Sequence, residues 1–193
     1  MKSFTLIELI VVIAIVAVLA AIIAPNAFKA IEKAKIATAI SDFKTYKTSM
    51  GALYADTGHW IADSFGPNRR AQGLYPGATN LDTNISNWPG WDGPYLEKVK
   101  LSTPWGGIYT IERWNDFGRG SRKEMWLGYD DLCYSGGLSN CYIPLKSAQK
   151  MDERIDDGDL STGSFRHGLY TSESSGDCAW ILVWDYTNWE PPD

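Results

Sequence analysis

Carboxylates are the side chains most able to do chemistry in this sequence, because histidine is scarce. The 193 residues include two histidines, His59 and His167, and neither has a nucleophile or a second metal ligand as an evident partner. A glycine-rich phosphate-binding loop is also missing from the sequence. Catalysis requires a nucleophile, an acid–base group or a metal in a defined constellation. The sequence therefore predicts a protein that is not an enzyme.

The densest group of carboxylates lies in the segment 143–163. Its members are Asp152, Glu153, Asp156, Asp157 and Asp159. Their spacing is not that of an EF-hand loop, which needs oxygen ligands at alternate positions and a distal glutamate. The segment instead predicts a short helix, with Pro144 in its first turn and Gly158 at its C-terminal cap. We therefore interpret these carboxylates as a helix end followed by a turn.

A different carboxylate stands inside the longest apolar run of the chain. Glu8 is the one charged residue between Leu6 and Ala24. Such a run forms a helix of about 30 Å, the thickness of a bilayer core, and a charge within it costs about 2.5–3.5 kcal/mol unless it reaches the headgroups. The residues leave two interpretations open: a signal peptide removed near Ala21 or Ala24, and a retained membrane helix.

Helical periodicity continues beyond the apolar run, through residues 27–57. Apolar side chains recur at helical steps, with lysines on much of the other face. The apolar positions are Ile31, Ile36, Ile40, Phe43, Met50 and Leu53. We expect Pro25 to kink or melt the helix at the joint between the two halves, and Gly58 to end it. The continuous pattern favours a retained helix, because removal of a signal peptide would leave this joint unexplained.

The front of the chain, SFTLIELIVVIAIVAVLAAIIAP, resembles the N-terminus of type IV pilins and pseudopilins over roughly the first 55 residues. The resemblance implies that prepilin peptidase removes the leader 1–3 and that the new amine of Phe4 is methylated. It also implies that Glu8 matters for assembly, and Pro25 stands where many members carry a proline. Ser3 departs from the glycine that usually precedes the cut.

The resemblance also implies the partners and the location of the chain. The partners are copies of itself in a helical filament, prepilin peptidase, a platform membrane protein and, indirectly, an assembly ATPase. The chain is expected as a single-pass protein among the lipids of the inner membrane before assembly, and in an extracellular or periplasmic filament afterwards. In that filament the amine of Phe4 on a neighbouring subunit would compensate Glu8. A net charge of -5 argues against nucleic acid as a partner.

The rest of the sequence predicts a β-sheet head. Residues 58–104 are rich in turn formers and predict a long connecting loop, whereas GGIYTIERW, KEMWLGYDD and CAWILVWDY predict strands. A long helix followed by strands predicts an α+β fold in which an antiparallel sheet packs on the helix, as in pilins. The expected parts are the leader 1–3, the membrane-spanning and filament-core half 4–26, the amphipathic half 27–57, the loop 58–104 and the head 105–193.

A second resemblance concerns PYLEKVKLSTPWGGIYTI, which is similar to a segment of the major pseudopilins of type II secretion systems. Thr103 stands where that family often carries an aspartate before its Pro-Trp-Gly turn. The family binds calcium in a loop of the head, so the resemblance implies a calcium site, with Asp116, Asp130 and Asp131 as candidates. A pseudopilin of type II secretion therefore remains an alternative to a pilus subunit.

Cysteines and tryptophans complete the set of candidate residues. An exported chain can pair two of its three cysteines; we favour a Cys141–Cys178 disulfide that brackets the C-terminal region, with Cys133–Cys141 as the alternative. The nine tryptophans either form a sugar-binding platform or bury large rings in a small head. We favour burial. The platform belongs to a third hypothesis, an exported glycan-binding protein with a cleaved signal peptide.

Overall fold

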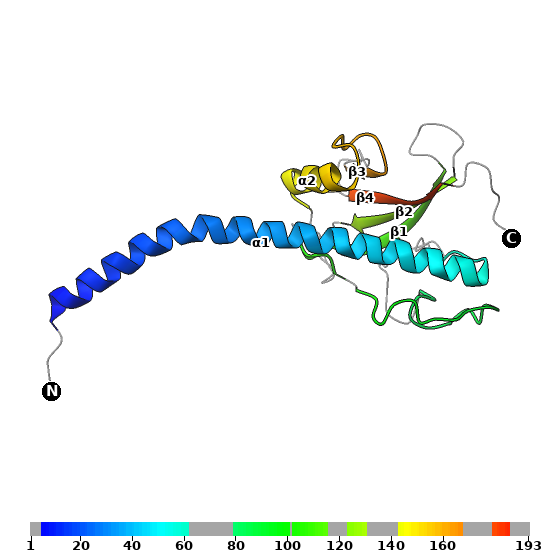
Figure 1. Cartoon of the computed structure of the whole chain (residues 1–193), viewed down its shortest axis with the longest axis horizontal. Coiled ribbons are helices and arrows are strands. Elements are labelled where there is room, and N and C mark those ends of the chain that lie inside the picture. The colour runs from blue at the N-terminus through cyan, green and yellow to red at the C-terminus, as the bar shows by residue number, and fades with distance from the viewer. Residues whose placement is uncertain are drawn as a thin grey trace.

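The computed structural model describes residues 5–61, 79–100, 102–115, 123–130, 143–167 and 179–185. Within them lie two helices, α1 (Leu6–Thr57) and α2 (Leu145–Ile155), and four strands, β1 (Ile108–Asn115), β2 (Lys123–Asp130), β3 (Phe165–His167) and β4 (Ala179–Asp185). The head covers the second half of α1, and the first half projects away from it (Figure 1). The predicted α+β fold with a long N-terminal helix is confirmed.

Local sequence signals define both ends of α1. Thr5 is the N-cap and forms a capping box with Glu8. Gly58 is the C-cap with a φ of 71°, and its N–H donates to the carbonyl of Tyr54 at 2.8 Å. A residue with a side chain would be strained in this left-handed conformation, so glycine suits the position.

The expectation that the helix would melt or kink at Pro25 is wrong, because α1 continues through it without interruption. Proline removes one backbone hydrogen bond, but the turns on both sides keep theirs, and helix propagation is cooperative. Figure 1 shows the first half of α1 as a gently curved rod, and curvature of this kind can accommodate a proline ring.

One face of the second half of α1 forms the core. Its buried residues recur at steps of three and four: Ile36, Ala39, Phe43, Tyr46, Met50 and Leu53. The predicted apolar stripe was correct from Ile36 onward but began too early, because Ile31 is 53% exposed. The head does not extend far enough along α1 to cover Ile31.

The strands form one antiparallel sheet in the order β1-β2-β4-β3. Strands β1, β2 and β4 match the three predicted strands, whereas β3 has three residues and was not predicted. The sheet packs on α1 through aromatic rings, since Phe43 meets Tyr109 and Phe165 edge to face at centroid distances of 6.5 and 6.1 Å. Such contacts add about 0.5–1.5 kcal/mol each beyond the burial of their area.

A buried polar group attaches the loop before β1 to the core. Asp42 of α1 accepts a hydrogen bond from the Tyr109 hydroxyl at 2.6 Å and forms an ion pair with the ammonium group of Lys100. One helical turn away, the Tyr46 hydroxyl donates to the Lys100 carbonyl at 2.8 Å and accepts from its N–H at 2.9 Å. Burial raises the pKa of Tyr46, so this hydroxyl keeps its proton and its donor role.

The tryptophans that the structure describes in the loop regions are packing residues. Trp60 is buried and stacks on Tyr54 at 4.4 Å. Trp88, Trp91 and Trp105 pack against the core and are partly buried. This arrangement agrees with the burial interpretation, since large rings add apolar area to a small head.

Candidate functional site

The first half of α1 is an apolar surface that the head leaves uncovered. Every residue from Leu6 to Ile31 is exposed, and the fraction is 76% for Leu6 and 50% for Val12. At 1.5 Å per residue this segment is about 39 Å long, and α1 is long and apolar enough to cross a membrane. Soluble monomers rarely expose continuous apolar surfaces of this size. Lipid or other protein helices must therefore cover it.

Glu8 lies at the tip of this surface, in the first turn of α1. Its carboxylate accepts hydrogen bonds from the backbone N–H of Thr5 at 2.8 Å and from the Thr5 hydroxyl at 2.7 Å. The hydroxyl in turn accepts a bond from the N–H of Glu8 at 3.4 Å. The capping box thus gives Glu8 two neutral hydrogen-bond donors within its own helix. Its counter-charge, expected from the Phe4 amine of a neighbouring subunit, stays a prediction.

The capping box uses only part of the Glu8 carboxylate. Both hydrogen bonds from Thr5 end on Oε2. Within the described residues, Oε1 can therefore still accept a hydrogen bond from a partner. Ile7, Val11 and Val12 lie beside it and line a shallow apolar hollow. A cation that docked here would meet a carboxylate already fixed in orientation and surrounded by apolar side chains.

Glu32 marks the place where α1 leaves the head. Its Oε1 accepts a hydrogen bond from the indole N–H of Trp105 at 3.0 Å and another from the hydroxyl of Ser147. One glutamate thus connects α1 to the turn before β1 and to α2. Glu32 was not among the residues predicted to be functional. The signal in the sequence is that one acid stands among three lysines on the polar face of the helix, Lys29, Lys33 and Lys35.

Several candidates from the sequence lie outside the described residues. They are Ser3, Phe4, Asp116, Asp131, Cys133, Cys141 and Cys178. Asp130 is the last residue of β2, where it is paired with Ile108, but its side chain is not among those described. Methylation of Phe4, the disulfide and the calcium site at Asp116, Asp130 and Asp131 therefore stay predictions.

Of the two histidines, His59 stacks on Trp88 at a ring-centroid distance of 4.9 Å.

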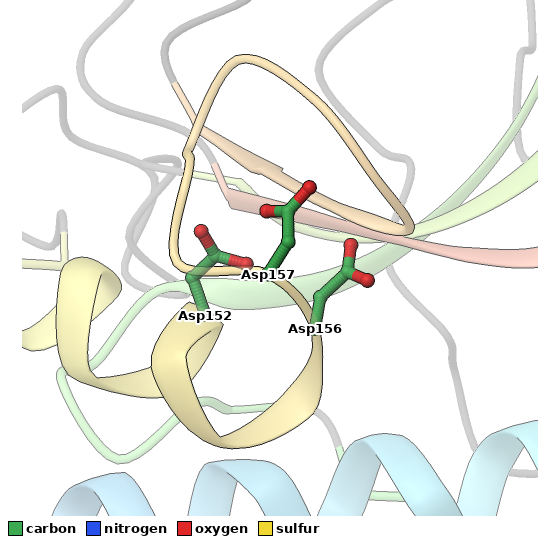
Figure 2. Close-up of side chains that lie close together, drawn as sticks. All are labelled: Asp152, Asp156 and Asp157. Atoms are coloured by element: carbon green, nitrogen blue, oxygen red, sulfur yellow. The ribbon is translucent and has the colours of Figure 1, made fainter.

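The carboxylates near the end of α2 form a second group of candidate residues. The helix ends at Ile155 with Asp156 as C-cap, so the predicted cap at Gly158 is two residues too late. Gly158 instead adopts a left-handed φ of 84° in the turn that follows. Carboxylate oxygens of Asp152, Asp156 and Asp157 lie within 4.8 Å of one another (Figure 2).

The three carboxylates differ in their surroundings. Asp156 accepts bonds from the N–H groups of Ser164 and Phe165. Asp157 accepts from the Asp159 N–H at 2.8 Å and the Thr162 hydroxyl at 2.9 Å.

Asp152 is completely buried, and its two carboxylate oxygens have no hydrogen-bond partner. Burial, followed by the negative charges of Asp157 and Asp156, raises the pKa of Asp152 to about 6. The helix-end interpretation did not foresee this convergence. The i, i+4 spacing of Asp152 and Asp156 at the predicted helix end could have indicated part of it.

Comparison with known protein families gives two matches. Residues 1–24 match the prokaryotic N-terminal methylation motif, and residues 30–121 match the family described as PilW, C-terminal. The first match contains the leader and Glu8, and the second runs from the packed half of α1 through β1. No curated protein and no solved structure matches the chain.

Proposed function

We propose that this chain, which is a type IV pilin-like protein, is a structural subunit of a type IV pilus, assembled through α1 from a pool in the inner membrane. The N-terminal methylation motif implies processing by prepilin peptidase and assembly into a pilus. The observation that carries the proposal is the uncovered apolar half of α1, residues 6–31, most of which lies within this motif. If the first segment were removed as a signal peptide, the mature protein would lack most of this apolar helix.

The exposed half of α1 suits both a lipid and a filament environment. Its apolar side chains face every direction around the helix axis, so several neighbouring helices can pack on it at once. Exchange of lipid tails for apolar side chains changes little hydrophobic free energy, since both surroundings are equally dry. The helix can therefore leave the membrane for the filament core, and a polar contact is needed to fix the position of each subunit.

Glu8 is the group we assign to that contact. Cleavage before Phe4 creates a cationic amine, and Oε1 of Glu8 has acceptor capacity for such an amine on a neighbouring subunit. A charge-assisted hydrogen bond is strong where water is excluded. Its geometry would favour one axial stagger between neighbouring helices. Glu8 would thus act as a registration contact, with the capping box holding it ready.

Within the pilus, the match to PilW, C-terminal favours a minor-pilin-type role over the main building block. A type II secretion pseudopilin would use α1 in the same way, so the pilus assignment depends on this match. The described tryptophans that pack against the core support a structural head rather than a glycan-binding platform.

The direct test is Glu8→Ala in the native host, followed by immunodetection of the chain in membranes and in sheared filaments. We expect normal amounts in the membrane and a more than about ten-fold loss from filaments, because truncation leaves the partner amine buried without its counter-charge. Glu153→Ala removes an equal charge from an exposed head position and should assemble like the wild type. Normal incorporation of the Glu8→Ala chain would contradict the proposed role.

A deletion of the chain separates the pilus from the secretion alternative. If the protein is a pilus subunit, its loss should reduce surface pili and leave protein export through the outer membrane unchanged. The opposite pattern, intact pili and failed export, would assign the chain to a type II secretion system.

A further inference from the structure

A buried carboxylate without a partner lies at the end of α2. The Asp152 side chain is 0% exposed, and neither of its oxygens has a hydrogen-bond partner. No lysine or arginine among the described residues forms an ion pair with it. Removal of a polar group from water without a compensating bond costs free energy, and the cost is higher for a charge. Such a group in a folded protein needs a physical explanation.

The carboxylates beside Asp152 increase this cost, and the backbone N–H of Gly158 offsets only part of it. Figure 2 shows the carboxylates of Asp156 and Asp157 gathered with that of Asp152 at the end of α2, beneath the loop that leads to β3. Asp152 is in the last turn of α2, where the partial charge of the helix end is itself negative. Three carboxylates and a helix C-terminus thus create a strongly negative region around a buried oxygen pair.

The turn holds this arrangement in place. Hydrogen bonds from the backbone of Ser164 and Phe165 fix Asp156, and bonds from Asp159 and Thr162 fix Asp157. These bonds hold the two exposed carboxylates beside Asp152 in spite of the repulsion. Each keeps further lone pairs, because a carboxylate has about four acceptor sites.

We propose that Asp152, Asp156 and Asp157 bind a calcium ion. All donors at the site are oxygens, and no histidine or cysteine of the described residues takes part, which argues against zinc. Calcium accepts irregular sets of six to eight oxygens, including carboxylates, carbonyls and waters, whereas magnesium requires near-ideal octahedral geometry. A bound ion would give Asp152 its missing partner and cancel the repulsion among the three carboxylates.

The expected consequence is structural. Asp152 belongs to α2, and Asp156 accepts hydrogen bonds from Ser164 and from Phe165, the first residue of β3. An ion held by both carboxylates would clamp α2 to the edge of the sheet. This site is separate from the one that the resemblance to secretion pseudopilins implies at Asp116, Asp130 and Asp131.

The test uses the full-length chain, purified in detergent and freed of metal with EDTA. Titration with CaCl2 should show about one equivalent bound at this site, with MgCl2 clearly weaker. Because the ion binds the folded chain, saturating calcium should also raise the melting temperature by several degrees over EDTA. Wild-type protein that neither binds calcium nor gains stability from it would overturn the proposal.

Asp152→Asn assigns the effect to the site, because the amide keeps the shape and removes the charge. We expect this variant to bind calcium about ten-fold or more weakly and yet to melt above the wild type in EDTA at neutral pH. Glu153→Gln is the matched control, as an exposed neighbour with the same charge change, and should behave like the wild type. A full calcium response in the Asp152→Asn chain would place the ion elsewhere and contradict the proposal.

A second variant tests the same site in case the Asp152→Asn chain does not fold. Asp157→Asn alters an exposed ligand and should also weaken calcium binding. Its amide oxygen can still accept from the Asp159 N–H, and its NH2 can donate to the Thr162 hydroxyl in place of the bond that Asp157 accepts there. If calcium still binds this variant normally but is lost in Asp130→Asn, the ion belongs to the other loop and the proposed site is wrong. Filament assembly is not part of these measurements, so the result is independent of the proposed function.

Discussion

At the scale of single residues, two carboxylates show how environment sets a role. Glu8 lies in an apolar surface, but the capping box of Thr5 supplies two hydrogen bonds and orients it. Asp152 lies inside the head, where neither oxygen completes a hydrogen bond and where two negative neighbours outweigh the nearby N–H of Gly158. The first is a locally satisfied charge with one oxygen available for a partner. The second is an unsatisfied charge that a proton or a cation must compensate.

Proton binding by Asp152 gives a pH prediction for the metal-free chain. Its folded pKa of about 6 exceeds the ordinary aspartate pKa of 3.8, so the folded state binds the proton more tightly than the unfolded state does. The resulting stabilisation is fully present below about pH 4 and is lost as pH rises through about 6. Between those limits the loss should be of the order of 2 kcal/mol.

This prediction is checked by denaturant unfolding in EDTA between pH 4 and 7. The difference in unfolding free energy between the wild type and Asp152→Asn isolates the one group, because other carboxylates titrate in both chains. We expect the variant to gain relative to the wild type as pH rises. A difference that does not change with pH would show that Asp152 titrates normally.

The sequence was informative about Glu8 and not about Asp152 or Glu32. Glu8 is conspicuous because an apolar run surrounds it, and that contrast is visible without a structure. The burial of Asp152 and the two contacts of Glu32 depend on where α2 docks and how the next turn folds back. Five acidic residues in a polar segment resemble an ordinary solvated helix end until the fold determines which of them is covered.

At the scale of elements, substitution of glycines tests the geometry of the turn after α2. Gly163 has a φ of 69°, and a Cβ there would collide with the Asp156 carboxylate. Gly163→Ala should therefore destabilise the chain by at least about 1–2 kcal/mol. Gly51→Ala, in an exposed and open part of α1, should stabilise it by about 0.5–1 kcal/mol. Thermal unfolding of both full-length variants in detergent provides the comparison, and equal effects would contradict the geometry.

Helices and strands were predicted correctly where the local sequence pattern was long. The prediction failed where the position of a residue depends on how the chain packs. The β-branched or aromatic residues of β1, β2 and β4 were sufficient to place them, whereas the three residues of β3 are too few to carry a pattern. Ile31 belongs to the helical stripe by spacing but lies beyond the reach of the head. Pro25 was expected to break α1, and helix cooperativity across the apolar turns outweighs one missing bond.

At the scale of the whole molecule, the chain consists of a packed head and a rod that extends beyond it (Figure 1). Glu32 joins α1 to the head at their boundary, and from Ile31 back to Leu6 every side chain is exposed. As a monomer in water, this chain would expose the apolar half of α1 to solvent. Lipid tails in a bilayer, or copies of the same helix in a filament, would cover it. The N-terminal methylation motif is typical of pilins, which move from the membrane into a filament.

The most direct test of this account is the intact mass and N-terminal sequence of the protein purified from membranes of its native host. We predict a chain that begins at Phe4 and is one methyl group heavier than its sequence, which would show that Ser3 supports cleavage. A chain that begins after Ala21 or Ala24 would contradict the account. Most of the exposed half of α1 would then be absent from the mature protein, and the filament would lose its core.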